Sequence, residues 1–192
     1  YDRWLHGDRA MEAALLKQRQ ALVNGYPVVS GELRTEDQVY DGTKGPGLDI
    51  YNKGSLIAHS LRLLIGDEAF FNSVRRLVYG RPDPRPGNFS PRFASTGDFL
   101  AIVNDESGQD LTWFCRAYLY QAALPDLHQT RNGDRLELDW VTGDGGAFPM
   151  PVEIEVDGTI TTLPMTDNHG TLTVPAGAHV LIDPRDRVLR RL

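Results

Sequence analysis

Tyr51 is the side chain in this sequence whose position most suggests a chemical role. It stands at the head of a predicted helix, in the segment DIYNKG at residues 49–54, directly after a glycine-rich stretch at residues 41–48. A phenol has a reference pKa of about 10, so it keeps its proton near neutral pH and can donate a hydrogen bond to a substrate. On spacing alone, a plain core or helix-capping residue is an equally good interpretation of Tyr51.

Gly54 is a second unusual residue of the same segment. It lies inside the predicted helix, one turn after Tyr51, where glycine costs about 1 kcal/mol relative to alanine. A glycine retained at such a position often marks close approach of another part of the backbone. We therefore expect another segment to pack tightly against this end of the helix.

The patterns expected for metal binding and nucleophilic catalysis are absent from the sequence. The five histidines form no His-Glu-x-x-His motif and include no pair four residues apart, so no zinc site made wholly from this chain is predicted. We expect His59 to be structural or partly exposed, and His128, His169 and His179 to lie on the surface of β segments. Cys115, the single cysteine, sits in an apolar helical run and is interpreted as a buried small hydrophobe.

Helical periodicity dominates the first two thirds of the chain and indicates the elements that position Tyr51. Apolar residues recur at helical spacing, and glycines or prolines follow the predicted helix ends. Asp49 is expected to cap the helix that carries Tyr51. Residues 25–48 contain five glycines and two prolines and are predicted to form a long loop, a kind of segment that is often functional or mobile. From its position before Tyr51, we expect this loop to line a substrate cleft. The predicted helices cover residues 7–23, 49–65, 67–79, 96–107 and 110–124.

From Asp126 onward the apolar period changes from that of a helix to that of a strand. Leu136, Leu138 and Trp140 alternate with polar residues, and Asn132-Gly133 and Asp157-Gly158 are hairpin turn signals. The fold class expected is therefore α+β with two domains. A helical domain covers residues 1–125, and a small antiparallel β-sandwich covers residues 126–192.

Composition narrows the choice of partners. The chain has 192 residues, 41% of them hydrophobic, and a formal net charge of −6. The negative charge argues against nucleic acid or an anionic membrane surface as a partner. No apolar run reaches the ~18 residues that a membrane span requires, so none is predicted.

Two stretches of the sequence resemble the aminopeptidase N-like zinc metallopeptidases, a gluzincin family. YNKGSLIAHSLRLLIGDEAFF, residues 51–71, is similar to that family's Tyr-x-Lys-Gly-Ala segment and the Leu-Arg, Gly-Asp-Glu and Phe that follow it. STGDFLAIVNDESGQDLTWFCRAYLYQAALPDL, residues 95–127, is similar to a later stretch of the family in both order and spacing. The resemblance covers residues 45–128, and the β segment falls where the family carries a β-sandwich.

The resemblance implies a specific function. This chain would be the C-terminal part of a zinc-dependent peptidase, holding the helical half of the catalytic domain. Tyr51 would be its catalytic residue and would donate a hydrogen bond to the tetrahedral intermediate opposite zinc. The zinc ligands would lie outside this chain, in a missing N-terminal half that becomes its partner, and the substrate would be a peptide. The chain alone would be inactive, and Lys53 is interpreted as structural.

The sequence also departs from the family. The family's zinc motif and its Gly-x-Met-Glu-Asn motif are absent, Ser55 replaces the usual alanine, Tyr118 stands where tryptophan is frequent, and Ala123 replaces a glycine. One alternative is therefore a non-catalytic, peptidase-like binding or scaffold module. Another is an unrelated helical domain with a carbohydrate-binding β-sandwich, which Trp140 and Phe148 support only weakly.

Overall fold

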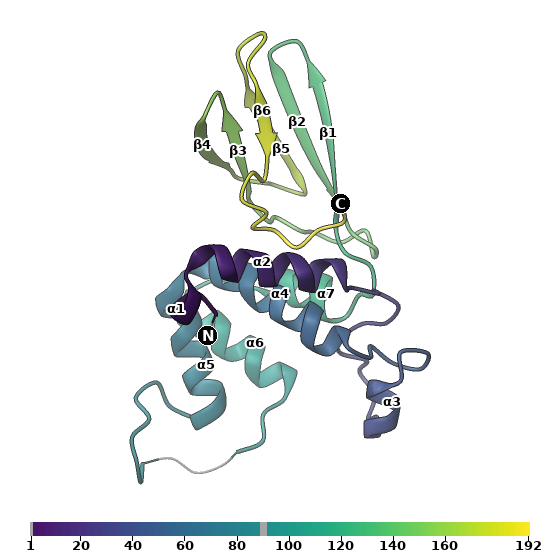
Figure 1. Ribbon diagram of the computed structural model, residues 1–192, viewed down its shortest axis with the longest axis vertical. Coiled ribbons are helices and arrows are strands. Elements are labelled where there is room, and N and C mark those ends of the chain that lie inside the picture. The colour runs from purple at the N-terminus through teal and green to yellow at the C-terminus, as the bar shows by residue number, and fades with distance from the viewer. Residues whose placement is uncertain (1, 89–91) are drawn as a thin grey trace.

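The protein has a helical part followed by a β-rich part, which lie at opposite ends of the molecule (Figure 1). The structure is a computed structural model that describes residues 2–88 and 92–192, with side chains from residue 4 onward. The α+β composition predicted from the sequence is confirmed. The helices are α1 (Asp2–His6), α2 (Asp8–Gln20), α3 (Glu36–Tyr40), α4 (Asp49–Ile65), α5 (Asp67–Tyr79), α6 (Thr96–Ser107) and α7 (Thr112–Leu119).

The last helix is shorter than its apolar sequence predicts. Helix α7 ends at Leu119, although the apolar run continues to Leu124. The carbonyl of Leu119 accepts a hydrogen bond from the amide of Val29 at 2.9 Å. The carbonyls of Gln121 and Ala122 accept from the Lys53 amine instead of from helical amides. These long-range partners end the helix before Pro125.

The β-rich part contains two three-stranded antiparallel sheets. One has the order β1 (Asp126–Asn132), β2 (Arg135–Val141), β5 (His169–Thr173), and the other β4 (Thr159–Leu163), β3 (Val152–Val156), β6 (Val180–Ile182). Leu136, Leu138 and Trp140 are all buried on β2, as their alternation predicts. Asp157 and Gly158 join β3 to β4 with φ angles of 48° and 85°, which suit the predicted two-residue hairpin turn.

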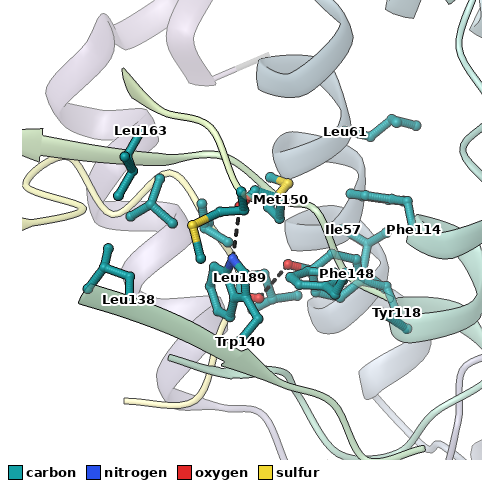
Figure 2. Packing of buried hydrophobic residues seen from close by; sticks show 14 of the residues in the cluster. Ile57, Leu61, Phe114, Tyr118, Leu138, Trp140, Phe148, Met150, Leu163 and Leu189 are labelled. Carbon is teal, nitrogen blue, oxygen red and sulfur yellow. Dashed lines mark hydrogen bonds between the residues drawn. The ribbon is translucent and has the colours of Figure 1, made fainter. Parts of the chain in front are cut away.

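One hydrophobic cluster spans the helices and both sheets (Figure 2). At its centre the ring of Phe148, which is fully buried, meets the rings of Trp113, Tyr118 and Trp140 at centroid distances of 5.2, 5.4 and 5.1 Å. The indole N–H of Trp140 donates to the Met150 carbonyl at 2.8 Å, so this buried polar group is satisfied. The aromatic cluster therefore joins α7 to the β-rich part.

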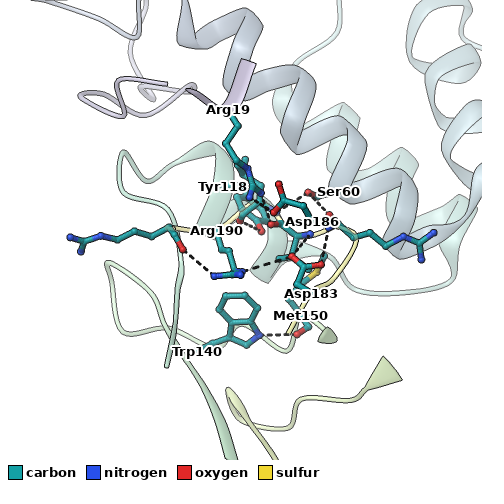
Figure 3. A network of polar contacts seen from close by, with 12 residues as sticks. Arg19, Ser60, Tyr118, Trp140, Met150, Asp183, Asp186 and Arg190 are labelled. Carbon is teal, nitrogen blue, oxygen red and sulfur yellow. Dashed lines mark hydrogen bonds and ion pairs between the residues drawn. The ribbon is translucent and has the colours of Figure 1, made fainter. Parts of the chain in front are cut away.

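Polar contacts hold the C-terminal segment after β6 against the helices (Figure 3). The Tyr118 hydroxyl donates to the Leu189 carbonyl at 2.6 Å. The Ser60 hydroxyl on α4 donates to the Arg187 carbonyl at 3.2 Å and accepts from the Leu189 amide at 3.1 Å. Arg19 on α2 donates to the Val188 carbonyl at 2.7 Å. The change from helix to strand falls between Leu119 and Asp126, and the division into two independent domains stays a prediction.

Candidate functional site

The start of α4 is fixed by a buried carboxylate. Asp49 was expected to be the N-cap, but Leu48 holds that position and Asp49 is the first helical residue. The Asp49 carboxylate is buried and accepts hydrogen bonds from the amides of Val23, at 3.2 Å, and Asn24, at 2.7 Å. The carboxylate therefore accepts hydrogen bonds from the segment after α2 rather than from its own helix. These bonds hold that segment against the start of α4.

Lys53 anchors the same helix from its other side. Its side chain is completely buried, and its amine donates to the carbonyls of Gln121 at 3.0 Å and Ala122 at 2.7 Å. Burial lowers the pKa of this amine to about 8, while the charge of Asp49 opposes the change. These contacts agree with the structural role expected for Lys53, and they tie α4 to the segment that leads into β1.

The buried amine predicts an unusual pH dependence of stability. Burial lowers the Lys53 pKa from 10.5 to about 8, so between these values the unfolded chain binds the proton and the folded chain does not. The contribution of Lys53 to the free energy of unfolding therefore rises as the pH increases across this window. Urea unfolding of the wild type and of Lys53→Met, measured at several pH values, should differ in slope. We expect the wild type to gain about 2–3 kcal/mol relative to the variant over the window. If the free energies of unfolding of the two proteins changed in parallel with pH, the prediction would be wrong.

Tyr51 is the third residue of α4, and its side chain is 57% exposed. Its hydroxyl oxygen lies 2.5 Å from that of Tyr40, and the two rings stack with centroids 6.2 Å apart at an interplanar angle of 24°. The hydrogen bond between the two hydroxyls, followed by the electrostatic effect of Tyr51, raises the pKa of Tyr40. The predicted site residue is thus one member of an exposed, hydrogen-bonded tyrosine pair.

The sequence interpretation missed Tyr40, because residues 25–48 were predicted to be loop. Tyr40 is the last residue of α3, a short helix inside that segment. Its start carries a capping box, in which the Thr35 hydroxyl accepts from the Gln38 amide and the Gln38 side chain accepts from the Thr35 amide. The spacing Thr-x-x-Gln is readable in a sequence and could have revealed this helix.

The surface of α4 at Gly54 is open. Gly54 was expected to allow close packing, and that expectation is wrong for the described residues. Apart from the helix's own backbone, none of their heavy atoms lies within 4 Å of a Cβ built there. Val23 and Leu48, which flank the helix start, are also large exposed apolar residues. The space beside Gly54, one turn after Tyr51, is therefore open and leaves room for a substrate or another part of the protein.

The other residues considered for chemistry form no site. In residues 2–88 and 92–192, no three His, Cys, Asp or Glu side chains come together to hold a metal ion. His59 is partly exposed, and His128, His169 and His179 are exposed, as expected. Burial raises the pKa of the Cys115 thiol to about 11, so it stays protonated and is a poor nucleophile. No helix in the described part of the chain is long and apolar enough to cross a membrane.

Comparison with known proteins yields a similarity of fold. Neither a protein-family profile nor a curated protein sequence matches this chain. The structure is similar to Legionella pneumophila aminopeptidase A, solved in complex with aspartic acid, with a TM-score of 0.56 and 15% sequence identity over 91% of this chain. The chain spans 22% of the length of that protein. This helix and sheet arrangement therefore occurs as part of a larger aminopeptidase structure.

Proposed function

We propose that this chain is the C-terminal part of a zinc-dependent aminopeptidase, in which Tyr51 stabilises the tetrahedral intermediate of peptide hydrolysis. Two independent observations support the proposal. The segment around Tyr51 resembles the tyrosine motif of a peptidase family, and the fold is similar to part of an aminopeptidase structure. The observation that carries it is the exposure of Tyr51 at the start of a helix that the contacts of Asp49 and Lys53 hold in place.

Tyr51 would act on the scissile carbonyl oxygen. Addition of a nucleophile to a peptide carbonyl converts its oxygen into an oxyanion, and a preplaced donor stabilises that charge more than it stabilises the neutral carbonyl. The contacts of Asp49 and Lys53 fix the start of α4, so the phenol needs little reorganisation to donate its proton in a hydrogen bond. The open face at Gly54 leaves space beside the ring for a peptide backbone.

The described residues of this chain do not fit a zinc centre, since no group of ligands converges among them. The metal ligands would therefore lie in a part of the protein outside this sequence. Zinc would polarise the carbonyl and the attacking water when bound there. What this chain contributes is the hydrogen-bond donor and the surface around it.

An assay of the complete protein tests the proposal. We expect it to release p-nitroaniline from aminoacyl-p-nitroanilides, to contain about one zinc per chain by metal analysis, and to lose activity when a chelator removes the metal. The 192-residue chain alone should be inactive. A complete protein that binds peptides but neither holds zinc nor cleaves them would be a peptidase-like scaffold, and the proposal would fail.

A further inference from the structure

The geometry points to Tyr40 as a positioning residue that donates a hydrogen bond to the Tyr51 oxygen and so directs the Tyr51 proton toward the substrate. The inference rests on the function proposed for Tyr51. It extends that function by assigning a role to a residue from a different helix, 11 positions earlier in the sequence and outside the motif that carries the family resemblance.

Either hydroxyl of the pair could be the donor, and the role proposed for Tyr51 sets the direction of the hydrogen bond. A phenol has one proton to donate and two lone pairs to accept with. The two oxygens are 2.5 Å apart, so one proton must lie between them. If that proton came from Tyr51, it would be unable to donate to an oxyanion. The working arrangement therefore requires Tyr40 to be the donor. A hydroxyl that accepts a hydrogen bond is itself a stronger donor, because the two bonds polarise one another.

The segment around Tyr40 is built to hold it in place. A Cβ at Gly45 would lie 2.1 Å from the Gln38 carbonyl oxygen, so the loop after α3 folds back against the helix where only glycine fits. The Gly47 amide donates to the Val39 carbonyl at 2.9 Å. The Asp41 carboxylate accepts from the amide and the hydroxyl of Thr43 at 2.9 and 2.7 Å. These contacts define the position of the residue that ends α3.

The charge next to Tyr40 favours the protonated form of its phenol. Glu36 lies one turn before Tyr40 on α3, and its charge adds to the effect of Tyr51 in raising the pKa of Tyr40. A phenolate at this position would be repelled by that carboxylate. Tyr40 is therefore available as a hydrogen-bond donor near neutral pH, as its positioning role requires.

The test is a double-mutant cycle in the complete protein, with Tyr40→Phe, Tyr51→Phe and the double variant. We expect Tyr40→Phe to lower kcat about 5- to 10-fold with little change in KM, because one hydrogen bond acting in the transition state is lost. In the Tyr51→Phe background, removal of the Tyr40 hydroxyl should change kcat less than about 2-fold, because Tyr40 acts only through Tyr51.

Tyr26→Phe is the matched control for damage to the loop. Its hydroxyl donates to the Thr43 carbonyl at 2.6 Å in the same segment, and it makes no hydrogen bond to Tyr51. We expect this variant to keep wild-type kcat. A loss of kcat in Tyr26→Phe equal to that in Tyr40→Phe would overturn the inference, because disturbance of the loop would then explain both.

A spectroscopic titration separates the inference from the proposed function. In the 192-residue chain labelled with ¹³Cζ-tyrosine, the Tyr40 resonance should titrate above an ordinary tyrosine, and Tyr51→Phe should bring it back toward the ordinary value. An unchanged Tyr40 titration, or equal effects of Tyr40→Phe in both backgrounds of the cycle, would overturn the positioning role. Full activity of Tyr51→Phe would instead refute the proposed function of Tyr51 itself.

Discussion

Replacing Tyr51 by phenylalanine in the complete protein is expected to reduce kcat for peptide hydrolysis about 10²–10³-fold, the usual cost of losing one donor to an oxyanion. The substitution removes a single oxygen from a residue that is 57% exposed, so folding should be unaffected. Since the donor acts in the transition state more than in the ground state, KM should change little. Steady-state kinetics on an aminoacyl-p-nitroanilide, with thermal unfolding as a check on folding, measures both quantities.

Tyr120→Phe is a suitable comparison for this variant. Tyr120 is a similarly exposed phenol, but it lies at the C-terminal end of α7 rather than at the start of α4. We expect Tyr120→Phe to retain wild-type kcat. Equal activity of Tyr51→Phe and Tyr120→Phe would show that the Tyr51 hydroxyl has no part in the chemistry.

The sequence predicted the helix that carries Tyr51, but not the contacts that hold this helix in place. The end of α4 before Gly66 follows from local patterns and the structure confirms it, whereas Leu48 takes the N-cap position that was expected for Asp49. The acceptors of Lys53 lie 68 and 69 residues later in the chain, and the Asp49 carboxylate binds amides 25 and 26 residues earlier. Periodicity describes neighbours along the chain, so it contains no information on such partners.

The same limit explains which strands were predicted. The central strands β2 and β3 bury apolar residues, and their patterns stand out in the sequence. Strands β1 and β4, two of the four edge strands, are mostly exposed, so their sequences lack that pattern and only their hairpin partners reveal them. For α7 the pattern predicted too much structure. The apolar run to Leu124 was predicted to be helical, but the helix ends at Leu119, whose carbonyl accepts from the distant Val29 amide.

Truncating Phe148 to alanine is expected to lower the free energy of unfolding by about 3–5 kcal/mol, as for other fully buried aromatic residues. Phe148 is fully buried, and its ring packs edge-on against the rings of Trp113, Tyr118 and Trp140. Its loss leaves a cavity between α7 and β2, where the surrounding rings cannot collapse without moving a helix or a sheet. Leu181→Ala, at a half-exposed position on β6, should cost less than about 0.5 kcal/mol.

The way in which Phe148→Ala unfolds also tests the predicted division at residue 125. Far-UV circular dichroism reports mainly on the helices, and near-UV signals report on Trp140 and its neighbours in the aromatic cluster. Because one cluster spans both parts and the C-terminal segment bonds to α2, α4 and α7, we expect both signals to change at the same, lower urea concentration.

If the near-UV transition moved while the helical transition stayed at its wild-type midpoint, residues 1–125 would be stable on their own. The helical part that presents Tyr51 would then be a domain independent of the sheets, and the β-rich part could be removed without disturbing the start of α4.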